Sequence, residues 1–216
     1  MRSLRIPALV AATAIVGIGA TAARNAEPPP PHFTLIEPIS WIVENQRGDP
    51  QKAGPCGGSN VDWGTESFVV NEAKGGAMQH LKFRETVYHP GHFRVALAVN
   101  SMGELPLDPV ATTQKDTLGR DMSVSAVIQN PPVAPVLADG LFQRTVRPAA
   151  LETFDTDIML PNINCDRCIL QVVQFMTVHA FNNPGGYSYH HCAIMHITAD
   201  PSKPIDTRWP AQRKTD

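Results

Sequence analysis

Apolar and polar residues alternate with a period of two along much of the chain. In the segment 92–100 the large apolar residues stand at every second position, which is the pattern of a strand that lays one face on a core. The segment 169–178 is apolar on both parities, as is typical of a central strand. Together with the turn residues between such runs, the pattern predicts strands at 33–38, 67–71, 80–89, 92–100, 169–178 and 190–198.

Few stretches carry a helical period, and the composition agrees with this. The 216 residues include 20 prolines, each of which removes a backbone donor and blocks a helix interior. The long segment 101–148 is rich in Pro, Asp and Ala, and we expect it to form loops or short strands over one end of the fold. Several strands, Pro-rich loops and a disulfide between strands together predict an all-β sandwich.

The first residues have the pattern of a secretory signal peptide. Arg2 and Arg5 precede an apolar stretch at 6–18, and the small residues Ala20-Thr21-Ala22 suit a signal peptidase. The apolar stretch is short for a membrane span, and no second one follows it, so a membrane-spanning protein is not expected. Export predicts a secreted or periplasmic protein.

The rest of the chain divides by composition. Residues 1–22 are the expected signal peptide, and residues 23–31, which end in four prolines, are expected to form an extended leader or tether. The folded domain is expected at 32–200, followed by a polar tail at 201–216.

Charge and motifs exclude several classes of function. The chain has 18 basic and 20 acidic side chains and no basic run longer than a dipeptide, which argues against nucleic acid as a partner. The sequence lacks HExxH, GxSxG and GxxxxGK, so zinc-protease, hydrolase and nucleotide-binding interpretations have no motif behind them. We interpret the pair Asp155 and Asp157 as solvated carboxylates.

The four cysteines are expected to form two disulfides, because an exported chain meets an oxidising compartment. Three pairings are possible. The closeness of Cys165 and Cys168 favours a local bond, which leaves Cys56 with Cys192 as a long bridge. No strand-helix-strand pattern surrounds Cys165-Asp-Arg-Cys168, which argues against a redox or zinc motif.

The histidines carry the candidate chemistry. His89-Pro-Gly-His92 places two imidazoles at a turn that enters a strand, His190-His191 adds two beside a cysteine, and His32 opens the first strand. Three such groups at one end of a sandwich would form a site for copper or zinc, which imidazole nitrogens suit. The eight histidines are His32, His80, His89, His92, His179, His190, His191 and His196.

Strand geometry limits this hypothesis. Neighbouring residues on a strand point to opposite faces, so at most one of His190 and His191 can face a given site. We expect His80, His179 and His196 to be ordinary strand or surface residues.

Five motifs, taken in order along the chain, resemble the lytic polysaccharide monooxygenase superfamily, in particular its bacterial polysaccharide-monooxygenase-like branch. They lie at 32–38, 51–58, 85–92, 165–171 and 187–192, and the resemblance runs from His32 to about Ala199. It implies an immunoglobulin-like or fibronectin-like β-sandwich with long loops, two disulfides and one exposed copper ion in a histidine brace.

The resemblance also implies a set of site residues. His32 would bind copper through its α-amine and its ring, and His92 would be the second histidine, with His89 as its close rival. Tyr189 corresponds to the aromatic residue beside the metal, and His191 to a further ligand or a supporting group. The pairs Cys56–Cys192 and Cys165–Cys168 match the long and the local disulfide of the family.

One departure from the family pattern matters for the site. The first ligand of the family follows the signal-peptidase site directly, whereas residues 23–31 here lie between that site and His32. An amide nitrogen lacks the basic lone pair of a terminal amine, so the full brace requires that these residues be removed. Otherwise copper is held by imidazoles alone.

Two functions follow as expectations. The first is oxidative cleavage of a polysaccharide at a glycosidic linkage by a monomeric copper enzyme that takes electrons from an external donor. Trp41 and Trp63 could then stack on sugar rings, or they could be core residues. The second is non-catalytic binding or acquisition of copper on the same fold.

Overall fold

The computed structural model describes residues 33–58, 63–124, 127–180 and 187–213. The predicted signal peptide, the leader and His32 lie outside these residues. The strands within them are β1 (Phe33–Glu37), β2 (Val70–Lys74), β3 (Met78–Glu85), β4 (Gly91–Ala98), β5 (Thr112–Lys115), β6 (Asp121–Val124), β7 (Val136–Arg144), β8 (Thr153–Met159), β9 (Cys165–Met176), β10 (Val178–Ala180) and β11 (Ser188–Thr198). The one helical element there is a 3₁₀ turn, η1 (Met102–Glu104).

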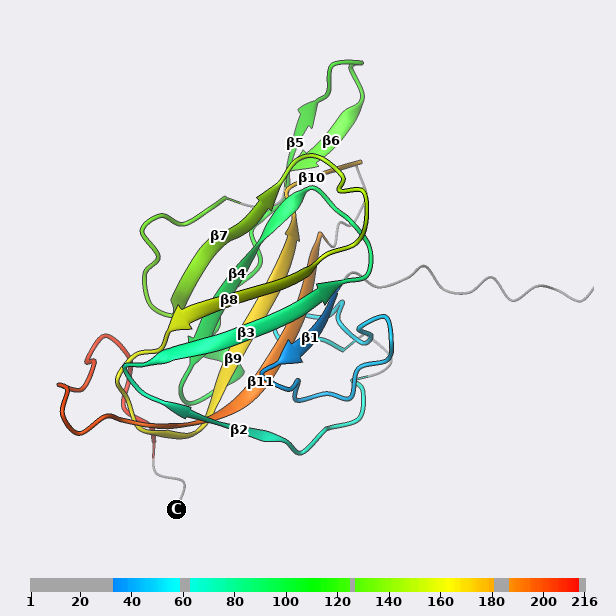
Figure 1. Cartoon of the computed structure of the whole chain (residues 1–216). Coiled ribbons are helices and arrows are strands. Elements are labelled where there is room, and N and C mark those ends of the chain that lie inside the picture. The colour runs from blue at the N-terminus through cyan, green and yellow to red at the C-terminus, as the bar shows by residue number, and fades with distance from the viewer. Residues whose placement is uncertain (1–32, 59–62, 125–126, 181–186, 214–216) are drawn as a thin grey trace, which may run out of the picture.

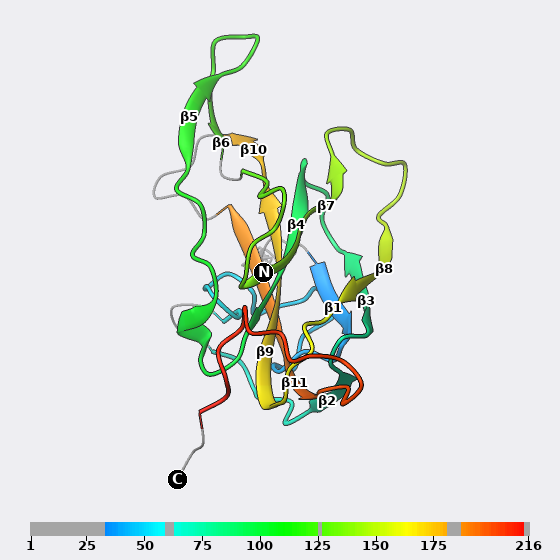
Figure 2. The ribbon, with the colours of Figure 1, turned by 90° about the vertical axis from the view of Figure 1, so that its left-hand side faces the viewer.

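Two stacked sheets form the body of the protein. The smaller has the order β1-β3-β8 and the larger the order β2-β11-β9-β4-β7. Figure 1 shows the smaller sheet in front of the larger one, and Figure 2 shows the two layers from the side. All pairs within these two sheets are antiparallel except β2 with β11. The prediction of an all-β sandwich is confirmed at this level.

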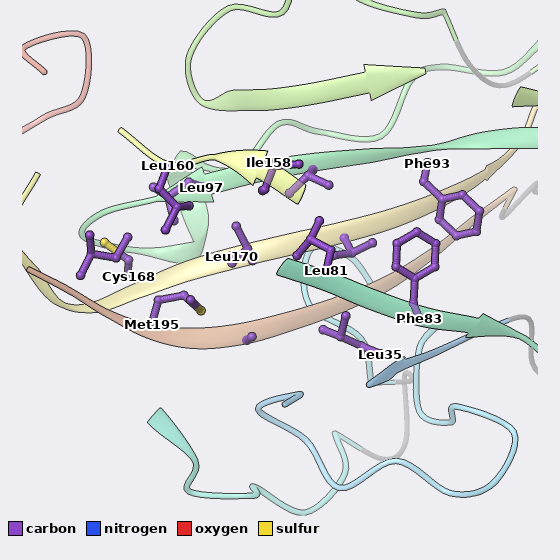
Figure 3. Close-up of a cluster of buried hydrophobic side chains, with 14 of the residues drawn as sticks. Leu35, Leu81, Phe83, Phe93, Leu97, Ile158, Leu160, Cys168, Leu170 and Met195 are labelled. Atoms are coloured by element: carbon purple, nitrogen blue, oxygen red, sulfur yellow. The ribbon is translucent and has the colours of Figure 1, made fainter. Parts of the chain in front are cut away.

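The core lies between the two sheets. In β4 and the residue after it, the large apolar residues 93, 95, 97 and 99 join the core, which confirms the period-two prediction for the segment 92–100. Phe93 faces Phe83 of β3 across the gap, with ring centroids 4.5 Å apart (Figure 3). Strand β9 is buried on both faces from Cys168 to Met176, as predicted for a central strand.

The outer face of the larger sheet is also covered. Ala96 and Ala98 of β4 point to this side, where they form a second apolar cluster with Leu105 and Cys192. Strands β4, β9 and β11 are therefore buried on both faces. One face packs against the smaller sheet, and the other contacts the second apolar cluster.

Both predicted disulfides are present. Cys56, in the loop after β1, is bonded to Cys192 of β11, and Cys165 is bonded to Cys168 at the start of β9. The long bridge joins two cysteines 136 positions apart in sequence and fixes the loop that carries Cys56 to the outer face of β11.

The segment 101–148 contains more regular structure than the sequence predicts. It holds β7, an edge strand of nine residues, which the sequence pattern does not reveal. Gly140 has a φ of +68° within β7, and the register of β7 against β4 is irregular, so no clean alternation marks this strand. Strand β8 is likewise absent from the prediction.

A third, small sheet has the order β10-β6-β5. Strands β5 and β6 form a hairpin that rises beyond the sandwich (Figure 1), and β10 follows β9 after Thr177. This arrangement brings β6 beside β10 and next to the start of β11.

The segment after Thr198 packs back on the core. Trp209 joins the main apolar cluster, and its Nε1 donates a hydrogen bond to the carbonyl oxygen of Leu97 at 3.3 Å. Within the described ranges, no helix has the length and apolarity that crossing a membrane requires.

Candidate metal centre

The turn His89-Pro-Gly-His92 lies between β3 and β4, near the start of β1. Phe33, the first residue of β1, pairs with Glu85 at the end of β3, four residues before His89. The motif that the sequence analysis singled out and the residue bonded to His32 are therefore brought to the same end of the sandwich.

The turn is held firmly against β9. The amide of Thr177 donates a hydrogen bond to the Pro90 carbonyl oxygen at 3.0 Å. At Gly91 an added Cβ would lie 1.8 Å from the carbonyl oxygen of Phe175, so any side chain there would force the strands apart. This position explains the glycine of the motif.

His92 is an anchor of this turn. It is buried, its Nε2 lies 3.3 Å from an Asp139 carboxylate oxygen, and its Nδ1 lies 3.3 Å from the hydroxyl of Thr177. Its ring also packs on Phe175, at 5.3 Å between centroids. Because protein groups face both ring nitrogens, the surroundings of His92 favour a structural role over metal binding.

His190 and His191 lie on opposite sides of β11, as strand alternation predicts. His191 points between the sheets, where its Nδ1 lies 2.8 Å from Glu44 and its Nε2 donates to the carbonyl oxygen of Phe33 at 3.0 Å. His190 points outward, and its Nε2 lies 2.9 Å from an Asp108 carboxylate oxygen. Both rings are buried.

His92 and His190 belong to one polar group whose side chains are buried except at Asp108, and we call it the outer-face network: His92, Arg94, Asp108, Asp139 and His190. Arg94 of β4 and His190 of β11 both pair with Val173 of β9, so their side chains are neighbours on the outer face. Burial raises the pKa of Asp108, but the hydrogen bond from His190 and the nearby charges outweigh it and hold this pKa below its usual value. The pKa of Asp139 is lowered as well, so both carboxylates are anions near the buried Arg94 guanidinium.

His89 has different neighbours. Its ring lies 5.5 Å from the ring of His179 and 6.5 Å from that of Tyr189, measured between centroids. His179 in turn lies 5.6 Å from Tyr187. We call these four residues the histidine cluster: His89, His179, Tyr187 and Tyr189. Both histidines are half-buried, and the Nε2 atom of His89 is itself buried.

The surroundings of the cluster favour the neutral forms of His89 and Tyr189. Burial, together with the nearby His179 and Lys52, lowers the pKa of His89 to about 4. Burial and the Asp49 carboxylate raise the pKa of Tyr189. At neutral pH the cluster therefore presents a neutral imidazole and a protonated phenol, and neutral imidazole is the form that binds transition metals.

Two members of the cluster were not predicted from the sequence. His179 lies on β10, and Tyr187 directly precedes β11; the Ser123 hydroxyl of β6 donates a hydrogen bond to the Tyr187 hydroxyl at 2.7 Å. Strand β10 pairs with β6 and not with β11, so no pattern within a single strand reveals the contact between His179 and Tyr187. We instead expected His179 to be an ordinary strand or surface residue.

The remaining histidines of the described residues have carboxylate neighbours on the surface. His80 lies 2.9 Å from Asp157 across the β3–β8 pair, and His196 lies 2.9 Å from Glu72. Their surface position agrees with the sequence analysis. Trp41 donates its Nε1 hydrogen bond to the Cys56 carbonyl oxygen at 2.8 Å, whereas Trp63 is 62% exposed.

The structure thus separates the predicted site residues. It brings His89 and Tyr189 together, and it places His92 and His191 among carboxylates and carbonyl groups. In the part of the chain that the structure describes, no three His, Cys, Asp or Glu side chains are grouped to hold a metal ion. His32, the predicted first ligand, lies outside the described residues.

The chain was compared with protein-family models, with curated proteins and with solved structures, and none of the three comparisons gave a match. The family resemblance therefore remains a prediction that rests on the five motifs alone.

Proposed function

We propose that this chain is an exported protein that binds one copper ion in a histidine-brace site on an immunoglobulin-like sandwich, and that it acts oxidatively on a polysaccharide. The observation that carries the proposal is the position of His89. It is half-buried among His179, Tyr187 and Tyr189 at the end of the sandwich where β1 begins. The motifs that resemble the monooxygenase superfamily supply the expected metal and reaction.

The donor chemistry of the cluster fits copper. Two imidazoles with a phenol beside them form a donor set of the type that copper prefers over magnesium or calcium. His89 and His32 would hold the ion, and Tyr189 and His179 would lie beside it. When bound, copper would supply a one-electron redox centre able to activate oxygen or peroxide.

The choice of His89 over its rival His92 rests on their neighbours. His92 is anchored by Asp139 and Thr177, and moving it to a metal would leave a buried carboxylate without its partner. His89 is kept neutral by its surroundings, so no proton must leave its ring before a metal binds at neutral pH.

The other residues near the site would orient and shield it. Tyr189 is buried and remains protonated, so it would present a neutral hydroxyl to the metal. His191 links Phe33 of β1 to Glu44 and would hold the start of β1 against β11. Trp63 is exposed enough to stack on a sugar ring, whereas the Trp41 indole is tied to the Cys56 loop.

A second function is non-catalytic copper binding or acquisition. The observation that favours it is the leader at 23–31, which precedes His32 and would block its α-amine if it remained attached. Side chains alone would then hold the ion, and turnover would not be expected.

The experiment combines the intact mass of the natively exported protein with a copper(II) titration followed by electron paramagnetic resonance. We expect a first residue at His32, binding of one copper ion, and at least a 100-fold loss of affinity in His89→Ala. His92→Gln serves as the matched control and should still bind one ion.

Each outcome discriminates between proposals. No copper binding by the wild-type protein contradicts both functions. A chain that begins near Ala23 and binds copper supports the second function. Full affinity in His89→Ala together with its loss in His92→Gln would transfer the ligand role to His92.

A further inference from the structure

A small pocket lies over the outer face of the larger sheet, between two loops that cover this face. Its volume is about 370 Å³, which is within the range of small-molecule sites in proteins. One wall is formed by Gly54 and Pro55, and the other by residues between Met102 and Asp108. None of these residues belongs to the histidine cluster, so the proposed function leaves the pocket without a role.

Buried polar side chains of the sheet hold both walls in place. The carbonyl oxygen of Pro55 accepts a hydrogen bond from Gln171 Nε2 at 2.7 Å, and the neighbouring Cys56–Cys192 disulfide ties the same wall to β11. The carbonyl oxygen of Pro106 accepts a hydrogen bond from Arg94 Nη2 at 3.4 Å. Because three strands of the sheet anchor the two loops, a ligand would not have to order them when it binds.

The lining of the pocket is apolar except at one end. Pro55, Leu105 and Leu107 contribute hydrocarbon surface, and the Leu107 side chain is 90% exposed. Of the described residues that line the pocket, Asp108 alone carries a charge. Its side chain is 41% exposed, so a ligand can contact the carboxylate.

His190 fixes the direction of this carboxylate from below. The two carboxylate oxygens of Asp108 lie 2.9 Å and 3.0 Å from His190 Nε2, and the imidazole is fully buried. At Gly54 an added Cβ would lie 3.4 Å from the same nitrogen, so the loop passes directly over the ring. A ligand in the pocket therefore meets the carboxylate and not the imidazole.

The charges around the pocket favour a cation. Burial raises the pKa of Asp108, but the hydrogen bond from His190 and the nearby charges hold it below its usual value, so the carboxylate is an anion at neutral pH. Asp108 and Asp139 both act electrostatically on the Arg94 guanidinium. Two carboxylates thus share one guanidinium, and of the two only the exposed Asp108 lines the pocket.

We propose that this pocket binds a small aliphatic amine, with its ammonium group on the Asp108 carboxylate and its hydrocarbon chain against Pro55 and Leu107. The ammonium group would donate a charge-assisted hydrogen bond, and the chain would remove the exposed Leu107 side chain from water. An anionic ligand of the same length would be repelled by Asp108. The inference does not depend on copper, so it stands or falls separately from the proposed function.

The test uses three probes that share one hydrocarbon chain and differ only in the polar group: n-hexylammonium, 1-hexanol and hexanoate. Each is titrated into the full exported protein at neutral pH and low salt, and binding is followed by the NMR shifts of the backbone amides. We expect n-hexylammonium to bind with a Kd of about 1 mM and to shift the amides of Gly103, Leu107 and Asp108. The alcohol and the carboxylate should bind at least about tenfold more weakly.

Three variants separate the charge from the apolar wall. Asp108→Asn should weaken n-hexylammonium binding at least about tenfold, and Leu107→Ser, at an exposed position, should weaken it about threefold. Asp155→Asn is the matched control, because Asp155 is a similarly exposed carboxylate beside a histidine, His80, on the smaller sheet. It should leave the affinity unchanged. Thermal unfolding checks that each variant is folded.

Several results would overturn the inference. They are the absence of saturable binding of n-hexylammonium, equal affinity for the alcohol, full affinity in folded Asp108→Asn, and amide shifts confined to other parts of the protein. Binding of a lysine-containing peptide at least about tenfold more tightly than n-hexylammonium would also overturn it, because the pocket would then serve a protein partner.

Discussion

The histidine cluster and the outer-face network use the same residue type in opposite ways. In the outer-face network, His92 and His190 are fully buried and each lies beside a carboxylate, Asp139 and Asp108 respectively. In the histidine cluster, His89 and His179 are half-buried and their rings face each other and two tyrosines. Only two residues of the chain separate His89 from His92, yet the two belong to different regions.

The difference teaches which histidines a metal can use. The imidazole of His92 lies beside the buried Asp139 carboxylate, and removing it leaves that buried group without its partner. The imidazole of His89 lies among aromatic rings, and burial holds it neutral, the form that binds transition metals. Local surroundings therefore decide the role of each histidine, and closeness in sequence does not.

The largest effect should come from breaking the outer-face network at Asp139. Asp139→Ala removes a buried partner of His92 and two hydrogen bonds from the amides of Gln129 and Gly140. We expect the free energy of unfolding to fall by about 3–5 kcal/mol, with one copper ion still bound. Chemical denaturation measures the first and titration the second.

The control for this change is Asp155→Ala, because Asp155 is exposed and its contacts are on the surface. It should alter stability by about 0.5 kcal/mol or less. A loss below about 1 kcal/mol in Asp139→Ala would show that the network is not the structural region described here.

The second prediction uses pH to separate the two regions. His89 has a pKa of about 4 in the folded protein and an ordinary value near 6.5 when unfolded, so the unfolded state binds more protons between these values. The metal-free protein should therefore lose about 2 kcal/mol of stability as the pH falls from about 6.5 to 4, with partial exposure already discounted.

The matched variant is His89→Gln, which should show a smaller loss over that range. The stability that the outer-face network contributes should be lost at lower pH. Its carboxylates have lowered pKa values, so this stability is lost only as the pH falls below about 3.8. Identical pH profiles for wild type and His89→Gln between 6.5 and 4 would contradict the assignment of a neutral, buried His89.

A smaller effect is expected at Asp108. Its carboxylate is partly exposed, so Asp108→Asn should destabilise the protein by about 1–2 kcal/mol, less than the change at Asp139. Thermal unfolding of the two variants side by side gives the comparison. A loss at Asp108 that exceeds the loss at Asp139 would reverse the expected order within the network.

The smallest effect should come from the hairpin contact with the histidine cluster. Ser123→Ala removes the hydrogen bond to the Tyr187 hydroxyl and should cost about 1 kcal/mol. If Tyr187 helps to orient His179, the copper(II) resonance spectrum should change while the stoichiometry stays the same. Tyr187→Phe serves as the partner variant, and a double-mutant cycle of the two should show that their effects are not additive.

The sequence alone determined much of the architecture of this protein. Strict alternation in 92–100 identified β4 and its core face, because a strand buried on one side requires a period of two. The apolar run at 169–178 identified the central strand β9, and the same alternation separated His190 from His191. The closeness of Cys165 and Cys168 led to both disulfides.

Only the tertiary structure decided the roles of the histidines. The carboxylates beside His92 and His190 belong to Asp139 and Asp108 in the segment 101–148. There β7 is irregular and the loops carry no period, so no local sequence pattern predicts these contacts. His179 joins the histidine cluster from β10, which pairs with β6, the strand whose Ser123 contacts Tyr187. Charge pairing and ring contacts depend on which segments meet in space, and a one-dimensional pattern records only which face of its own strand a residue occupies.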